Sequence, residues 1–166
     1  SSLFYVAPPV RYGYHGLGEL FVAINMGPVM VMGSNWVLLG RVDWSALPVS
    51  LPIGLMVALI LYYQSLPDME TDEAAGKRTL AVRLGKRGAR TILAVFWTSI
   101  YASVAALTLA GYFSPIAWCT LLTLPLLIKV WRLVVSIRNW VELDFHGKYI
   151  RIFYFINGLI LIAALF

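Results

Sequence analysis

Two aspartates four residues apart, Asp68 and Asp72, lie between two long apolar stretches of the chain. Side chains at positions i and i+4 of a helix share one face, so the two carboxylates would lie together. Lys77 and Arg78 follow about one helical turn further on. Mg²⁺ binds through one or two carboxylates together with substrate phosphates, and Lys and Arg bind the phosphates themselves. The segment 68–78 therefore has the residues to hold Mg²⁺ and a diphosphate at the end of a membrane span.

The acids also have a simpler explanation, because carboxylates at the start of a helix are stabilised by the helix dipole, by less than about 1 kcal/mol each. The basic residues that follow favour a binding site. Gln64, four residues before Asp68, would share its face, and Ser65 would cap a new helix that begins there. Tyr62 and Tyr63 have two open interpretations: an aromatic belt at the membrane surface, or ring faces that stabilise a carbocation.

The composition is that of an integral membrane protein. Hydrophobic residues make up 60% of the 166 residues and the mean hydropathy is +0.79, whereas soluble domains are about half apolar. The net charge of +5 does not indicate nucleic-acid binding, because the basic residues lie between membrane segments and not on a soluble face. The single cysteine, Cys119, excludes an intrachain disulfide and is expected to fill space in the core.

Five apolar stretches are long enough to cross or nearly cross a bilayer, which takes about 20 residues. They cover residues 20–39, 48–66, 92–112, 116–135 and 150–166. The sequence thus predicts an all-α fold, a polytopic transmembrane bundle of about five helices. Residues 67–91 and 136–149 would be long, charged connections, and Gly33 and Gly54 would allow close packing between helices.

The basic residues predict the orientation in the membrane. If the five spans alternate, the leader and both long connections share one side, which carries all of the 13 Lys and Arg except Arg41. Basic residues collect on the cytoplasmic side of membrane proteins. We expect an integral protein of the bacterial or archaeal inner membrane, with the Asp68–Asp72 loop in the cytoplasm. The basic residues of that side are Arg11, Lys77, Arg78, Arg83, Lys86, Arg87, Arg90, Lys129, Arg132, Arg138, Lys148 and Arg151.

The segment Gln64-Ser-Leu-Pro-Asp-Met-Glu-Thr-Asp72, continued by Gly76-Lys-Arg-Thr-Leu-Ala-Val-Arg-Leu-Gly85, resembles the second aspartate-rich motif of the UbiA superfamily of intramembrane prenyltransferases. Gly16-Leu-Gly-Glu19, followed by Gly27-Pro28, is similar to the branch that includes the 1,4-dihydroxy-2-naphthoate polyprenyltransferases of menaquinone synthesis. The chain departs from the family in having Gln64 where asparagine is usual, and Pro67 where some branches have arginine.

The resemblance implies a nine-helix fold in which two aspartate-rich motifs hold Mg²⁺ ions across a central cavity. A polyprenyl diphosphate loses its diphosphate there, and an aromatic acceptor attacks the allylic cation. Asp68 and Asp72 would be metal ligands and catalytic residues, together with Lys77. Gln64, Arg78 and Arg11 would bind the diphosphate. The partners would be polyprenyl diphosphate, an aromatic small-molecule acceptor and the lipid bilayer, with no prediction of oligomeric state.

No Asn-Asp-x-x-Asp-x-x-x-Asp segment, the family's first motif, occurs in the sequence. Residues 1–166 are therefore expected to form a partial prenyltransferase domain, the C-terminal half of the fold, that is inactive by itself. Three other functions remain as alternatives: a prenyltransferase of the same kind for another acceptor, phospholipid head-group transfer, and a transporter or assembly subunit. The last would need charges near the middle of the spans, whereas the clear acids lie at their ends.

Overall fold

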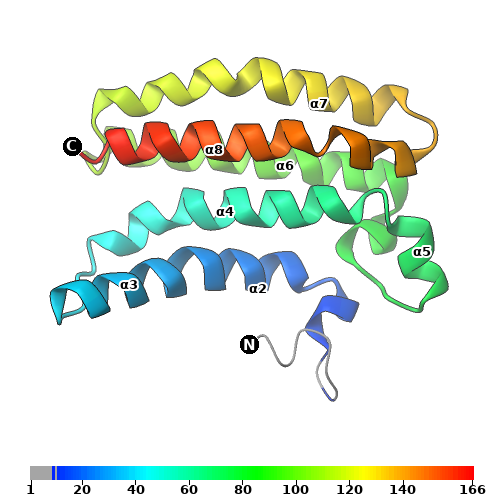
Figure 1. Ribbon diagram of the computed structural model, residues 1–166, viewed down its shortest axis with the longest axis horizontal. Coiled ribbons are helices and arrows are strands. Elements are labelled where there is room, and N and C mark those ends of the chain that lie inside the picture. The colour runs from blue at the N-terminus through cyan, green and yellow to red at the C-terminus, as the bar shows by residue number, and fades with distance from the viewer. Residues whose placement is uncertain (1–8, 10) are drawn as a thin grey trace.

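The computed structural model describes residue 9 and residues 11–166. Every regular element in this part of the chain is helical, and the long helices run side by side along the molecule (Figure 1). The predicted all-α bundle is confirmed. In chain order the elements are η1 (Tyr12–His15), α2 (Gly18–Ile24), η2 (Asn25–Val29), α3 (Met30–Leu39), α4 (Ala46–Ser65), α5 (Met69–Ala74), α6 (Leu80–Leu109), η3 (Pro115–Thr123), α7 (Leu124–Ser136), η4 (Trp140–His146) and α8 (Lys148–Ala163).

Four helical stretches are long and apolar enough to cross a membrane: Gly18–Leu39, Ala46–Ser65, Leu80–Leu109 and Pro115–Ser136. The fifth predicted span corresponds to α8, which has 16 residues and packs against α4 and α7. Large apolar side chains such as those of Val37, Leu109 and Leu122 are exposed on the outside of these helices. Apolar surface of this kind is suited to contact with lipid.

The connection expected over residues 67–91 contains the predicted new helix, but the following helix begins at Leu80, well before the predicted start of the span at residue 92. The connection contains α5 and the start of α6, whose N-cap Thr79 accepts a hydrogen bond from the Val82 backbone N–H at 3.3 Å. Gly85, at φ 63° and ψ 175°, separates the first turn of α6 from its long apolar part. The charges of this segment suggested a loop, but they lie on the outer face of an amphipathic helix whose other face buries Ala81, Ala89 and Leu93.

The first span and α4 approach each other closely at two glycines. A Cβ atom on Gly27 would lie 2.9 Å from the Gly54 Cα, and a Cβ atom on Gly54 would overlap the Ala23 carbonyl oxygen. The packing role predicted for Gly54 is thus confirmed. Around Gly33, by contrast, a Cβ atom would meet nothing within 4 Å, so this glycine does not mediate a close contact between the described helices.

Tyr62 and Tyr63, near the end of α4, are buried in the core of the bundle. The Tyr62 hydroxyl donates to the Ala89 carbonyl at 2.8 Å, and the Tyr63 hydroxyl donates to the Leu143 carbonyl at 3.1 Å. The two side chains tie α4 to α6 and η4, so they do not form an interfacial belt. Ser65 does not cap α5, as its hydroxyl donates to the Tyr62 carbonyl at 2.7 Å and Asp68 is the N-cap residue.

The polar connections gather at one end of the bundle. η1, α5 and η4 lie at this end, whereas the α3–α4 and α6–η3 connections and the C-terminus lie at the other (Figure 1). The loop between α5 and α6 is tied to η1 by the Arg78 backbone N–H, which donates to the Tyr14 carbonyl at 3.0 Å. The described element before the first span, η1, and the two charged connections therefore share one end, as the alternation of spans predicts.

Candidate functional site

A polar pocket of about 190 Å³ opens at the end of the bundle where α4 leads into α5. The buried Pro67 follows the end of α4, and the chain turns there into α5, which begins at Met69. The backbone N–H of Asp72 donates to the Asp68 carbonyl at 2.7 Å, so one helical turn separates these two residues. The pocket is lined by Gly13, Gly18, Glu19, Leu61, Gln64, Ser65, Asp68, Asp72, Lys77 and Thr79.

Asp68 and Asp72 both line this pocket, as their spacing predicts. Asp68 is exposed at its mouth, whereas the Asp72 side chain is only 14% exposed. Asp72 Oδ1 lies 3.1 Å from the Lys77 Nζ. Asp72 Oδ2 is buried and has no hydrogen-bond partner among the described residues, which is an expensive arrangement for a carboxylate oxygen.

Lys77 is brought back over the pocket by the turn that ends α5. Gly76 adopts a left-handed conformation, with φ at 72°, and its N–H donates to the Glu73 carbonyl at 3.0 Å. The Lys77 N–H then donates to the Asp72 carbonyl at 2.8 Å. These two bonds form the Schellman motif that terminates many helices, and it requires a residue tolerant of positive φ. The local sequence Gly76-Lys77 thus places the ammonium group beside Asp72.

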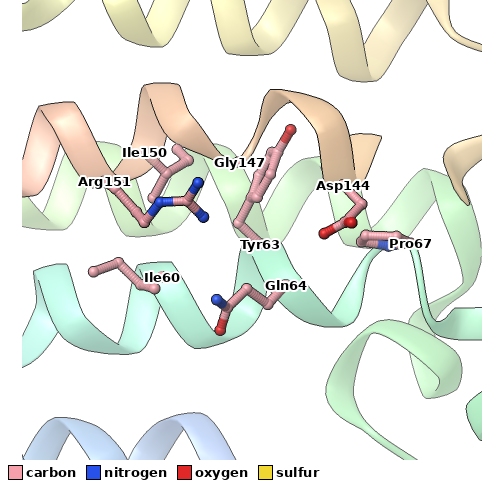
Figure 2. A pocket seen from close by; sticks show the side chains of 8 residues that line it. All are labelled: Ile60, Tyr63, Gln64, Pro67, Asp144, Gly147, Ile150 and Arg151. Carbon is pink, nitrogen blue, oxygen red and sulfur yellow. The ribbon is translucent and has the colours of Figure 1, made fainter. Parts of the chain in front are cut away.

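Gln64 also lines the pocket, one turn before Asp68, with its side chain exposed. It borders a second, much smaller notch of about 20 Å³ between α4 and the η4–α8 segment. Figure 2 shows the guanidinium of Arg151 and the carboxylate of Asp144 entering this notch from opposite sides of Tyr63. Gln64 therefore separates two polar hollows at the same end of the bundle.

The two arginines predicted to bind diphosphate lie outside the polar pocket. Arg78 is exposed and borders a different hollow of about 370 Å³, together with Glu73 and Arg83. The Arg11 guanidinium lies 5.8 Å from the centre of the Tyr14 ring. The described part of the chain thus brings together Gln64, Asp68, Asp72 and Lys77 in one pocket whose lining does not include the two arginines.

Two polar residues that the sequence did not single out as site residues, Glu19 and Thr79, complete the lining. Glu19 lies in the first turn of α2 and is only 6% exposed. Thr79 is buried and caps α6. An isolated acid at the start of an apolar span is the signal that could have identified Glu19, because such residues are costly in a membrane protein and face its interior.

The donor set fits a divalent cation. Asp68 and Asp72 supply carboxylate oxygens at one pocket, and Asp72 Oδ2 is buried without a partner in the described structure. No three Asp, Glu, His or Cys side chains of the described residues converge into a closed metal cage. That arrangement suits Mg²⁺, which prefers one or two carboxylates and completes its shell with water and substrate phosphates.

Comparison with known proteins identifies the family. Residues 1–141 match the model of the UbiA prenyltransferase family. The chain is 32% identical over 121 residues to the 1,4-dihydroxy-2-naphthoate octaprenyltransferase of Bacillus subtilis, covering 73% of this chain and 39% of that protein. It is 33% identical over 168 residues to the enzyme of the same name from Escherichia coli, covering 97% of this chain and 54% of that protein.

A third relative, the 2-carboxy-1,4-naphthoquinone phytyltransferase of Synechocystis, is 31% identical over 164 residues, covering 96% of this chain and 52% of that protein. The chain thus spans about half of the length of these relatives, or less. No solved structure gives a significant match. The family match, which extends over most of the residues and includes the aspartate pair, agrees with the resemblance found in the sequence: the chain belongs to the UbiA prenyltransferase family.

Proposed function

We propose that the protein to which this chain belongs transfers a polyprenyl group from an allylic polyprenyl diphosphate to an aromatic acceptor and releases diphosphate. The proposed acceptor is 1,4-dihydroxy-2-naphthoate, as in menaquinone biosynthesis. The observation that carries the proposal is the polar pocket, in which two carboxylates and an ammonium group converge at one end of an apolar bundle. Membership of the UbiA family supports the same reaction class.

The residues of the pocket have distinct roles in this proposal. Asp68 and Asp72 would hold Mg²⁺, which stabilises the negative charge that develops on the departing diphosphate. Lys77 is 28% exposed at the pocket and has donors to spare beyond the one that Asp72 accepts, so it can also donate to a phosphate oxygen. Gln64, one turn before Asp68, can donate its amide to the same group.

The position of the pocket suits a substrate with a charged head and a long apolar tail. The pocket lies at the polar end of the bundle, next to helices with apolar outer faces. A diphosphate can bind there from water while the isoprenoid chain extends along the helices. We infer that this end faces the cytoplasm, because all of the 13 Lys and Arg except Arg41 belong to the segments at this end or to the adjoining helix ends.

The acceptor is inferred from relatives. The names of the Bacillus subtilis and Escherichia coli relatives specify 1,4-dihydroxy-2-naphthoate and an octaprenyl group, whereas the Synechocystis relative is named as a phytyltransferase. Naphthoate-type acceptors are common to these names, and the isoprenoid differs. We therefore propose the acceptor class and leave the length of the isoprenoid to experiment.

The test is a prenylation assay on the full-length protein in membranes, with Mg²⁺, labelled geranylgeranyl diphosphate and a panel of aromatic acids that includes 1,4-dihydroxy-2-naphthoate. The expected result is a prenylated naphthoate product that disappears in the Asp68→Ala, Asp72→Ala variant. A Glu142→Ala variant is the matched control, since Glu142 is an exposed acid of η4 outside the pocket. Undiminished product in the aspartate variant contradicts the metal assignment, and product only with other acids contradicts the acceptor.

A further inference from the structure

Glu19 is a buried acid on the wall of the polar pocket. It belongs to the first turn of α2, far in sequence from the aspartate motif, and the residue is 6% exposed. It lines the same pocket as Asp68, Asp72 and Lys77. Three acids from two separate parts of the chain therefore face one hollow, although the sequence motif contains only two of them.

The partners of the Glu19 carboxylate are few. Lys77 is the one basic residue among the described residues that line the pocket with it. No side chain of the described residues donates a hydrogen bond to it or forms an ion pair with it within 4 Å. The Lys77 ammonium is engaged by Asp72 at 3.1 Å. Burial of an ionised carboxylate is expensive unless a cation or several donors compensate it, and a cation in the pocket would supply that compensation.

We infer that Glu19 is a third acid of the cation site. Its carboxylate contacts the divalent cation proposed for Asp68 and Asp72 indirectly, through water molecules bound to the cation. The inference rests on the proposed function and extends it to a residue outside the aspartate motif. Direct coordination by all three acids is not indicated, since no three acids of the described residues converge closely enough. Mg²⁺ retains several of its waters when it binds to proteins, and a nearby carboxylate can accept hydrogen bonds from these waters.

The space around Glu19 allows such an arrangement. The pocket has a volume of about 190 Å³, which is enough to hold a few water molecules at about 30 Å³ each. Gly13 and Gly18 are buried and line the pocket beside Glu19, and neither has a side chain to fill that space. Glu19 is thus a positioning residue: it orients the hydration shell of the cation and adds negative potential at the site, without touching the diphosphate.

The alternative is that Glu19 serves only as a counter-charge for Lys77. The two explanations differ in their effect on metal binding without substrate. A residue that holds the hydration shell of the cation determines metal affinity, and loss of such residues typically weakens it by about 10- to 100-fold. A mere counter-charge of Lys77 determines the position of the ammonium group, so once Lys77 is neutralised the further change Glu19→Gln leaves the cation affinity unchanged.

The experiment measures Mn²⁺ binding to the purified full-length protein in detergent, in the absence of substrates, by the electron paramagnetic resonance signal of free Mn²⁺. The variants are Glu19→Gln, which keeps the shape of the side chain, Glu19→Asp, which keeps the charge, and Glu142→Gln as the control for loss of an exposed acid at the same end. The Asp68→Asn, Asp72→Asn double variant shows the effect of losing the site itself. Glu19→Gln is also measured in the Lys77→Met background, with Lys77→Met alone as its reference.

The expected result is Mn²⁺ binding weakened about tenfold by Glu19→Gln relative to the wild type, and by Glu19→Gln with Lys77→Met relative to Lys77→Met alone. The loss is smaller in Glu19→Asp and absent in Glu142→Gln. Wild-type affinity in folded Glu19→Gln, or the affinity of Lys77→Met alone in the combined variant, overturns the inference, while loss of binding in the aspartate variant upholds the proposed site. Wild-type affinity in the aspartate variant as well overturns the metal assignment itself. If Glu19→Gln does not fold, Glu19→Asp decides: unchanged affinity for Mn²⁺ overturns the inference.

Discussion

Asp72 and Lys77 are joined twice, once through the backbone and once through their side chains. The Lys77 N–H donates to the Asp72 carbonyl at 2.8 Å, and the Lys77 ammonium lies 3.1 Å from Asp72 Oδ1. The backbone bond belongs to the turn that ends α5 at Gly76. A single helix terminus thus positions both the carboxylate proposed to bind the metal and the ammonium group proposed to bind the diphosphate. A change in that turn must alter the position of both groups.

Gly76→Ala tests this dependence. With φ at 72° and no neighbour within 4 Å of an added Cβ, the alanine is strained in its backbone and does not clash. The left-handed conformation costs an ordinary residue about 1–2 kcal/mol. We expect a several-fold rise in KM for the polyprenyl diphosphate, because the Lys77 ammonium shifts. Gly76→Asn is the matched control, since asparagine tolerates this conformation, and equal kinetics in the two variants contradict the prediction.

Lys77→Met removes the ammonium group and keeps the length of the side chain. Charge-assisted hydrogen bonds are worth roughly 1.5–3 kcal/mol, so KM for the polyprenyl diphosphate is expected to rise about tenfold or more. Lys77→Arg retains the charge and should recover part of the loss. Steady-state kinetics at saturating acceptor provide the measurement, and Lys148→Met, which removes an exposed lysine outside the pocket, serves as the control. An unchanged KM in Lys77→Met removes Lys77 from the diphosphate site.

Gly54→Ala is expected to destabilise the bundle. The added methyl group overlaps the Ala23 carbonyl oxygen of the first span, and overpacking of this kind typically costs about 1–3 kcal/mol. Gly33→Ala is a matched control within an apolar helix, because nothing lies within 4 Å of its Cβ position. Thermal unfolding in detergent should show a lower Tm for the first variant only. A loss of equal size in both variants would indicate that Gly33 has a partner beyond this chain.

Tyr63→Phe removes a hydroxyl that is buried between α4 and η4 and leaves the Leu143 carbonyl without its donor. An unsatisfied buried acceptor costs about 1–3 kcal/mol. We expect a lower Tm with little change in kcat, since the aromatic ring remains and Tyr63 does not line the polar pocket. Tyr112→Phe, at an exposed tyrosine, is the control. A Tyr63→Phe protein with wild-type stability and a large loss of kcat would indicate a catalytic role.

The sequence was sufficient to predict the helices of the bundle and the pairing of Asp68 with Asp72, because hydropathy and the helical repeat are local properties. The start of α6 was misjudged because Lys86 and Arg87 were expected to belong to a loop, whereas the helix directs both side chains outward. The placement of Tyr62 and Tyr63 in the core depends on α6 and η4, which lie far along the chain.

The site was predictable only where its residues are neighbours in sequence. Asp68, Asp72 and Lys77 lie within one short segment, and helix geometry brings them together. Glu19 reaches the pocket because α2 packs against α4, a tertiary contact with no counterpart in the local sequence. Arg78 follows Lys77 directly, yet the turn after α5 directs it to a different hollow, since adjacent residues outside a helix need not share a face.

The central claim is that Asp68 and Asp72 hold a divalent cation at the pocket where the diphosphate departs. The most direct test is a structure of the full-length protein with Mn²⁺ and a non-reactive polyprenyl diphosphate analogue, in which anomalous scattering locates the metal. We predict a Mn²⁺ peak within coordination distance of both carboxylates, with the diphosphate beside Lys77. A metal bound elsewhere, with the Asp68 and Asp72 side chains turned toward solvent or lipid, would contradict the account.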